Sequence, residues 1–283
     1  MTIRIASIQL NSQTNIDANL DIIGRAIADV APHTDIIVLP ENMCVMGRQN
    51  ELAWRFDEIC NTLSNLAKIH QIHLVAGTLP CNRRHNGTVV SDGKYRQTNL
   101  VFDPNGRQIA RYDKIHLFRA TVNDSTGSYD ESKTFEAGDE LVVVPLSIQD
   151  QKINLGLMIC FDVRFPMMAQ KLRALGADII SVPAAFTHKT GEAHWQLLLQ
   201  ARALDSQCMM IGSTQGGIHH IGSKSRETWG HAMMVDAHGQ VIADSHQSEV
   251  GEAGYLVVYG EFDKTKQEHI RQSMPIFNCH RLN

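Results

Sequence analysis

The chain has 283 residues, a formal net charge of -4, 43% hydrophobic residues and 20% charged residues, which are ordinary values for a soluble globular protein. Its lysines and arginines are scattered without interleaved aromatic residues, and no apolar run approaches the roughly 20 residues that span a bilayer. The first ten residues also lack the basic, apolar and small-residue parts of a secretory signal. We therefore expect no nucleic-acid partner, no membrane association and a cytoplasmic location.

Six cysteines are spread too thinly over the chain for a disulfide scaffold, and no CxxC pair suggests a zinc site. They are Cys44, Cys60, Cys81, Cys160, Cys208 and Cys279. A reducing compartment suits this use of cysteine, because it keeps a thiol free for chemistry.

The first half of the chain alternates predicted strands and helices. Residues 3–10 are typical of a strand, and apolar residues then recur at helical spacing from Leu20 to Val30. Residues 35–40 form a continuous apolar run, as expected of a strand covered on both faces. The pattern predicts one helix over residues 51–69 and another strand over residues 73–79.

Two hairpins interrupt this alternation. Residues 99–103 and 108–111 flank the turn Pro104-Asn105-Gly106, and residues 232–243 turn at Ala237-His238-Gly239. Between them, residues 120–139 are polar and rich in turn formers, which predicts a long loop. Loops of that length inside a compact domain are usually functional.

The rest of the chain again alternates. Strands are predicted over residues 153–160, 178–183, 209–213 and 255–258, and helices over residues 167–175 and 193–204. This order indicates an α/β layered fold with mixed sheets. Ligands in such folds gather at the carboxyl ends of strands, where Glu41, Lys114 and Cys160 are expected.

Cys160 is the candidate nucleophile. It ends an apolar strand, and the next residues lead directly into a helix, so the side chain would sit at a sharp turn. We expect the helix N-terminus to favour the thiolate and to offer backbone N–H groups to a developing oxyanion. The alternative is an inert buried cysteine, as we expect for Cys60 and Cys208.

Glu41 and Lys114 are the candidate partners of that thiol. Glu41 follows a buried strand, where a carboxylate either caps the next segment or serves as a general base. Lys114 has close apolar and aromatic neighbours, which is unusual for a surface lysine. An ammonium beside a thiolate lowers the thiol pKa and binds an oxyanion, although a plain surface lysine remains the alternative.

Three motifs together resemble the nitrilase, or carbon–nitrogen hydrolase, superfamily. They are LPEN around Glu41, YDKIHLF around Lys114 and GLMICFDVRFP around Cys160. The resemblance covers essentially the whole chain and implies a single carbon–nitrogen hydrolase domain over residues 1–283. It also implies a four-layer α-β-β-α sandwich, a Glu–Lys–Cys triad, and homodimers or higher homo-oligomers that extend the sandwich.

The resemblance suggests further site residues. Glu131 is similar to the superfamily's second glutamate, which positions the lysine and the substrate; the alternative is one more loop acid. The segment FTHKTGEAHWQLLLQARALDSQ resembles the branch that contains omega-amidase and deaminated-glutathione amidase. By that resemblance Arg164 would bind a substrate carboxylate and Thr190 would assist. Their structural alternatives are a helix-surface ion pair and a helix N-cap.

Histidines near the C-terminal half invite a metal interpretation. His219 and His220 are adjacent, but no third ligand stands at a recognisable spacing, so we predict no metal and no other cofactor. Whether either histidine contacts substrate stays open. His194 and Trp195 are expected to serve in the core or beside the site.

The implied reaction is hydrolysis of a small linear amide through a cysteine thioester. The stretch from Gln215 to His231 resembles deaminated-glutathione amidase more than omega-amidase, which implies 2-oxoglutarate and Cys-Gly as products and a role in metabolite repair. Three alternatives remain at this point. They are omega-amidase activity on 2-oxoglutaramate, a papain-like Cys–His hydrolase and a catalytically inactive interaction module.

Overall fold

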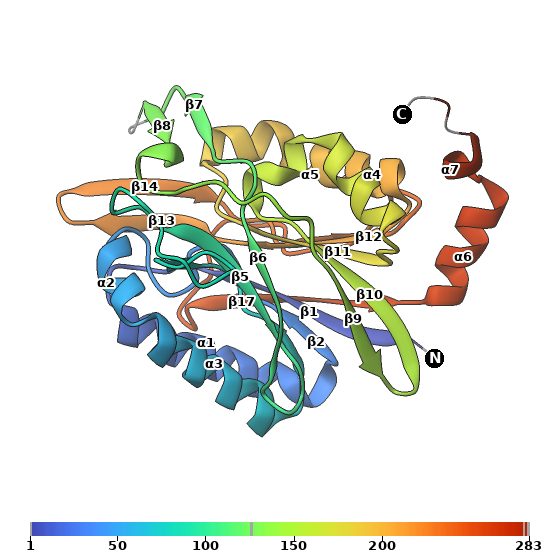
Figure 1. The fold of residues 1–283 in the computed structure, drawn as a ribbon, viewed down its shortest axis with the longest axis horizontal. Helices are drawn as coiled ribbons and strands as arrows, with labels where there is room; N and C mark the ends of the chain where they lie inside the picture. Colours follow the sequence, from blue (N-terminus) through green and yellow to red (C-terminus); the bar gives the residue numbers. More distant parts are fainter. Residues whose placement is uncertain (1, 125–126, 280, 282–283) are drawn as a thin grey trace.

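Two β-sheets face one another across the middle of the molecule, and helices cover the outer face of each (Figure 1). This arrangement is seen in a computed structural model that describes residues 2–124, 127–279 and 281. Within those residues, no helix combines the length and the apolar character needed to cross a bilayer.

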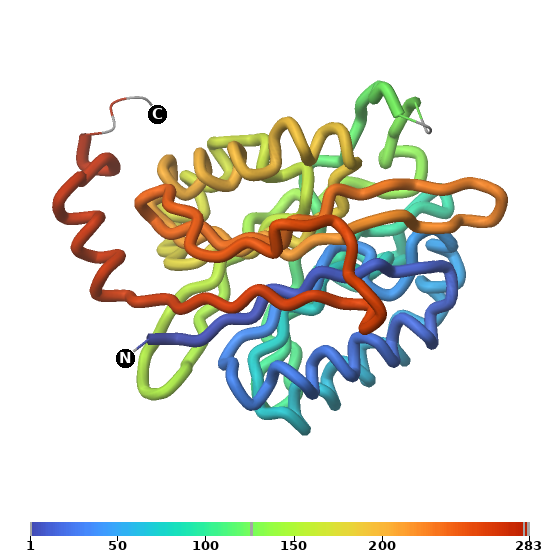
Figure 2. Tube along the Cα trace, turned by 180° about the vertical axis from the view of Figure 1, so that it is seen from behind, coloured from blue at the N-terminus to red at the C-terminus, as the bar shows by residue number. Residues whose placement is uncertain are grey.

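The first sheet runs in the order β17-β1-β2-β3-β5-β4, with β6 paired to β5. Its strands are β1 (Ile3–Leu10), β2 (Ile36–Val38), β3 (His73–Val75), β4 (Leu79–Cys81), β5 (Arg96–Phe102), β6 (Gln108–Asp113) and β17 (Tyr255–Phe262). β1 is parallel to β2 and antiparallel to β17, so the N-terminal strand lies beside the last strand of the chain (Figure 2).

The second sheet runs in the order β16-β15-β12-β11-β10-β9. Its strands are β9 (Val143–Ile148), β10 (Gln151–Leu157), β11 (Ile179–Ala184), β12 (Met209–Thr214), β15 (Met233–Val235) and β16 (Val241–Asp244). β10, β11 and β12 are mutually parallel, and a helix follows each of the first two. Their carboxyl ends therefore meet at one edge of the sheet.

Helices form the outer layers. They are α1 (Ile16–Val30), α2 (Gln49–Trp54), α3 (Phe56–His70), α4 (Pro166–Ala174), α5 (His188–Ser206), α6 (Lys264–Ser273) and α7 (Ile276–Cys279). The apolar stripes of α1 and α3 pack on the first sheet, and those of α4 and α5 pack on the second. The predicted α-β-β-α sandwich is confirmed.

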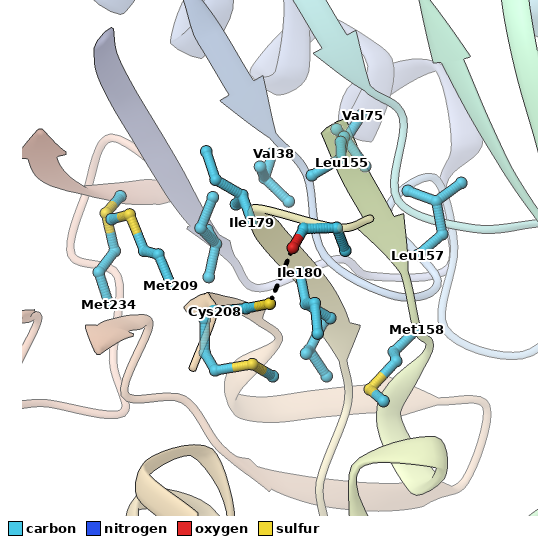
Figure 3. Packing of buried hydrophobic residues seen from close by; sticks show 14 of the residues in the cluster. Val38, Val75, Leu155, Leu157, Met158, Ile179, Ile180, Cys208, Met209 and Met234 are labelled. Atoms are coloured by element: carbon cyan, nitrogen blue, oxygen red, sulfur yellow. Dashed lines mark hydrogen bonds between the residues drawn. The ribbon is translucent and has the colours of Figure 1, made fainter. Parts of the chain in front are cut away.

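The core between the sheets is built from alternate residues of each strand. In β1, Ile3 and Ile5 join the side chains of the second sheet, whereas Ile8 faces the helices. Figure 3 shows this packing around Cys208, whose Sγ lies 3.1 Å from the backbone oxygen of Ala177. Burial raises the pKa of the Cys208 thiol and raises that of Cys60 to about 12. The inertness expected of both thiols stays a prediction.

Three predicted segments differ from the observed elements. The predicted strand over residues 73–79 is a strand only in β3 (His73–Val75) and again from Leu79, where β4 begins. The predicted helix over residues 51–69 is two helices, α2 and α3, which meet at Arg55; the buried residues Leu52, Ile59 and Leu63 keep helical spacing across the break, so apolar periodicity carries no sign of it. The predicted loop over residues 120–139 contains part of a small hairpin, β7 (Arg119–Thr121) with β8 (Ser128–Asp130), and a 3₁₀ helix (Glu131–Lys133).

A further hairpin, β13 (Gly216–Ile221) with β14 (Lys224–Trp229), was not predicted at all. The hairpins β7–β8 and β13–β14 lie at the same end of the molecule in both views (Figures 1 and 2). That end is also where the candidate site lies, since a residue of β14 packs on a residue of β8 and lines the same pocket as Cys160.

Candidate active site

Lys114 is buried between two carboxylates. It directly follows β6, and its Nζ lies 2.8 Å from Oε1 of Glu41 and 2.9 Å from Oε2 of Glu131. Burial alone would lower the pKa of Lys114, but the charges of Glu131 and Glu41 outweigh it and hold that pKa well above its usual range. The ammonium is therefore permanently charged and fixed in place.

Glu41 is held by the turn that follows β2, and its side chain is only 2% exposed. Gln215 donates from Nε2 to the Glu41 backbone oxygen at 3.1 Å. The preceding Pro40 carbonyl passes so close to Gly77 that a Cβ there would lie 2.1 Å from its oxygen. Gly77 also has a φ of +57°, so this contact needs glycine for two reasons.

Glu131 reaches Lys114 from the 3₁₀ helix after β8. Its Oε2 accepts a hydrogen bond from the backbone N–H of Phe118 at 2.7 Å, and its own N–H donates to the Phe118 carbonyl at 2.9 Å. Burial and the charge of Glu41 raise the pKa of Glu131, against the opposing effect of Lys114. The structure therefore brings the predicted second glutamate to the lysine.

Cys160 starts a 3₁₀ helix (Cys160–Arg164) shortly after β10, and its φ of 47° lies in the left-handed region. Such a conformation is strained for a residue with a side chain and is typical of a nucleophile on a sharp turn. Burial, followed by the charge of Glu41, raises the pKa of the thiol well above its usual range. Lys114 and a hydrogen bond from the Ala185 backbone oppose this shift without reversing it.

The expectation that a helix N-terminus favours the Cys160 thiolate is thus wrong for the resting state. α4 begins only at Pro166, beyond the 3₁₀ turn, and the macrodipole acts over about one turn of its own helix. The thiol is protonated at rest and needs a base.

Asp162 holds the Cys160 turn against the segment that carries Lys114. Its Oδ2 accepts from the Tyr112 hydroxyl at 2.6 Å and from the Ile159 N–H at 2.9 Å. Its Oδ1 accepts from the His116 backbone N–H at 3.0 Å and lies 2.8 Å from Nδ1 of His116. Sequence reasoning missed this network, although Tyr112 and Asp162 lie inside the YDKIHLF and GLMICFDVRFP motifs.

A pocket opens beside Cys160. Its lining residues are Glu41, Asn42, Phe118, Glu131, Cys160, Phe161, Arg164, Ala185, Phe186, Thr187, Thr190 and Arg226. Five of the six predicted site residues therefore share one pocket, and Lys114 contacts two of them. Arg226 was missed because the hairpin that carries it was not predicted.

Arg164 is half-buried in this pocket. Its guanidinium carbon lies 5.1 Å from the ring centroid of Phe186 and 5.9 Å from that of Phe161, and its Nη2 is 3.3 Å from Nδ1 of His194. No carboxylate in the described part of the chain forms an ion pair with it, so the surface ion pair considered above is not found there. Burial lowers the pKa of Arg164.

Thr190 lies in the first turn of α5, where its hydroxyl is 2.8 Å from that of Thr187. Thr187 occupies the N-cap position, so the alternative N-cap role of Thr190 is wrong. Both residues line the pocket.

The adjacent histidines lie outside this pocket. His219 is buried, with Nδ1 2.8 Å from the Ser12 carbonyl oxygen and Nε2 2.6 Å from the Thr228 hydroxyl, whereas His220 is exposed. Within the described ranges, no group of three or more His, Cys, Asp or Glu side chains is arranged to hold a metal ion.

Known proteins resemble this chain over almost its full length. The sequence profile of the carbon–nitrogen hydrolase family matches residues 4–272. The deaminated glutathione amidase of Yersinia enterocolitica is 33% identical over 283 residues, covering 98% of this chain and 93% of that protein. The protein of the same name from Synechocystis is 36% identical over 278 residues, covering 95% of each chain.

Solved structures agree with the sequence matches. The NitFhit protein of C. elegans gives a TM-score of 0.82 at 30% identity, covering 99% of this chain but only 65% of that longer one. Nit3 of Saccharomyces cerevisiae, a member of branch 10 of the nitrilase superfamily, gives a TM-score of 0.77 at 28% identity, covering 97% of this chain and 94% of that one. The chain therefore belongs to the carbon–nitrogen hydrolase family, as its motifs implied, and is an enzyme that hydrolyses carbon–nitrogen bonds.

Proposed function

We propose that this enzyme is an amidase that hydrolyses deaminated glutathione to 2-oxoglutarate and Cys-Gly through a thioester on Cys160. The observation that carries the proposal is the buried Lys114 ammonium, fixed by Glu41 and Glu131 beside a pocket that also exposes Cys160 and Arg164. Relatives of known name, at 33% and 36% identity, supply the substrate.

Activation of the thiol falls to Glu41. The raised pKa of Cys160 means that the sulfur is protonated before substrate binds, so attack on a carbonyl needs a base within the pocket. Glu41 lines that pocket, and the hydrogen bond that it accepts from Lys114 fixes the direction of the carboxylate. We assign the base to Glu41 and the fixed cation to Lys114.

The reaction then follows two acyl transfers. Glu41 takes the thiol proton as sulfur bonds to the amide carbon, and the carbonyl oxygen becomes an oxyanion facing the Lys114 ammonium and the Phe161 backbone N–H. The carbon–nitrogen bond breaks as Glu41 returns the proton to the departing amine, which leaves a thioester. A water that loses its proton to Glu41 adds to the thioester, and the sulfur leaves with that proton restored. No step uses a metal or an organic cofactor.

The acyl part of the substrate carries a carboxylate, and Arg164 is the residue we assign to it. Its planar guanidinium suits bidentate binding of a carboxylate, and the described residues leave it without a carboxylate partner. Thr190 and Thr187 line the same pocket, and we assign their hydroxyls as further donors to that carboxylate.

Turnover of deaminated glutathione and 2-oxoglutaramate, measured side by side, tests the substrate. The two share their acyl group and differ in the leaving amine, which is Cys-Gly in one and ammonia in the other. We expect kcat/KM to be at least about tenfold higher for deaminated glutathione. The reverse preference would make the enzyme an omega-amidase that uses the same site.

The proposal includes a homodimer in a reducing cytoplasm. α4, the Leu175 that follows it, and α5 form an outer layer and expose large apolar side chains that a second copy would cover: Met167, Leu175, Leu197 and Leu204. Light scattering on the purified protein should give the mass of a dimer or a larger assembly. The cytoplasm fits a mechanism that needs the Cys160 thiol reduced.

A further inference from the structure

The pocket beside Cys160 holds a second guanidinium, that of Arg226, which no step above uses. Arg226 lies on β14, and its Nη2 donates to the Ala185 carbonyl at 2.9 Å. Its guanidinium carbon lies 5.4 Å from the ring centroid of Tyr129 on β8. The hairpin β13–β14 thus delivers a fixed positive charge to the pocket from outside the two main sheets (Figure 1).

The surroundings of Arg226 leave that charge unpaired. Within the part of the chain that the structure describes, Nη1 contacts only the thioether of Met46, at 3.9 Å, and the buried Nε has no hydrogen-bond partner. Its neighbour across the hairpin, His219, is neutral near pH 7 because burial, with a smaller effect of Arg226, lowers the pKa of His219 to about 4. Among the described residues, no carboxylate forms an ion pair with Arg226.

The two pocket arginines are anchored on adjacent residues of one segment. Arg226 bonds the Ala185 carbonyl, and Arg164 stacks on the Phe186 ring. The Ala185 backbone also lies close enough to Cys160 to lower the pKa of its thiol. The same segment therefore fixes both guanidiniums relative to the nucleophile. Arg164 reaches the pocket from the 3₁₀ helix and Arg226 reaches it from β14. A substrate lying across the thiol meets both cations.

We propose that Arg226 binds the carboxylate of the leaving group, the C-terminal glycine of Cys-Gly, while Arg164 binds that of the acyl group. This assignment rests on the proposed function and deepens it. Deaminated glutathione has a carboxylate on each side of the scissile amide, whereas 2-oxoglutaramate has one, on the acyl side only. Arg226 is therefore the residue that sets the preference for a dipeptide leaving group over ammonia.

The test compares Arg226→Gln with the wild type on deaminated glutathione and on its C-terminal glycinamide, which lacks only the distal charge. The readout is kcat/KM on deaminated glutathione divided by kcat/KM on the glycinamide. Loss of a charge-assisted, fork-shaped contact should lower this ratio by about tenfold or more, mainly through KM on deaminated glutathione. Lys224→Gln is the matched control, because it removes an exposed positive charge from the same strand and should keep the wild-type ratio.

Equal losses on both substrates would overturn the assignment, since Arg226 would then serve only to hold Ala185 in place. Arg226→Lys covers the case in which the glutamine variant does not fold. Lysine keeps the charge but cannot bind a carboxylate through two N–H groups of a planar guanidinium, so the kcat/KM ratio should still fall. An unchanged ratio in this variant contradicts the proposal equally. A wild type that cleaves 2-oxoglutaramate but not deaminated glutathione contradicts the proposed function itself. The two failures are thus distinguishable.

Discussion

Replacing Asp162 by asparagine measures how strongly the active-site framework depends on one buried carboxylate. Asp162 is fully buried, and each of its oxygens has two partners: the Tyr112 hydroxyl and the Ile159 N–H on one side, and the backbone N–H and the ring Nδ1 of His116 on the other. The amide of asparagine must turn its NH2 toward one of these pairs, whichever way it lies. Of the two groups that then face the NH2, the Tyr112 hydroxyl or the His116 Nδ1 can switch to accepting, but the backbone N–H loses its bond, worth about 1.5–3 kcal/mol. The two bonds on the other side lose their charged acceptor, at about 1 kcal/mol each, so we expect a total loss of about 3.5–5 kcal/mol.

Urea unfolding of the wild type, Asp162→Asn and Tyr112→Phe gives the comparison. Tyr112→Phe removes one of the four bonds and also leaves the Ile115 N–H without the hydroxyl that accepts from it at 3.1 Å, so its loss should be about 2–4.5 kcal/mol. kcat should fall in both variants, because the network ties the Cys160 turn to the Lys114 segment. A loss below about 1 kcal/mol for Asp162→Asn, with normal kcat, would refute the reasoning.

Three further predictions concern single side chains. Lys114→Arg should be nearly inactive despite its charge, because a broad planar guanidinium cannot replace a compact ammonium between Glu41 and Glu131; about half of normal activity in a steady-state assay would contradict this. Arg164→Lys should raise KM far more than it lowers kcat on carboxylate-bearing amides, and equal impairment on an amide without that carboxylate would show a structural role instead. Burial lowers the pKa of His219 from 6.5 to about 4, so below pH 6.5 the unfolded chain binds a proton that the folded chain excludes. The stability that neutral His219 contributes is therefore present above pH 6.5 and is lost as the pH falls. The free energy of unfolding should be lower by ~2 kcal/mol at pH 5 for this reason. Urea unfolding of His219→Asn at pH 7 and 5 should show that part of the loss removed, and an unchanged pH dependence would contradict the assignment.

The sequence predicts the layered fold because apolar runs and helical periodicity report directly on burial. β1, β2, β10, β11 and β12 all fall where such runs stand. Glu41 follows β2 of the first sheet and Cys160 follows β10 of the second, so the sequence places each at the carboxyl end of a strand. Bringing the two side chains together depends on how the two sheets pack face to face, which the strand pattern does not report. Lys114 follows the strand of a hairpin whose turn, Pro104-Asn105-Gly106, is equally local information.

The remaining parts depend on contacts between distant segments. The ion pairs of Lys114 with Glu41 and Glu131 span 73 and 17 residues, and no local pattern reports on them. Only one face of the hairpin β13–β14 packs on the protein, so its apolar signal is weak: Ile218 and His220 are exposed while His219 is buried. Its one local signal is the two-residue turn Gly222–Ser223 between the paired residues Ile221 and Lys224, and that turn would have led to Arg226.

The most direct test of the central claim is peptide-level mass spectrometry after acid quench of the enzyme turning over deaminated glutathione, with Cys160→Ala beside it. We predict a 2-oxoglutaryl group on Cys160 of the wild type. We also predict equal release of 2-oxoglutarate and Cys-Gly by the wild type, and at least roughly a 1,000-fold loss of turnover in Cys160→Ala with its thermal unfolding preserved. Near-normal turnover by Cys160→Ala, or an acyl group on another cysteine, would contradict the account.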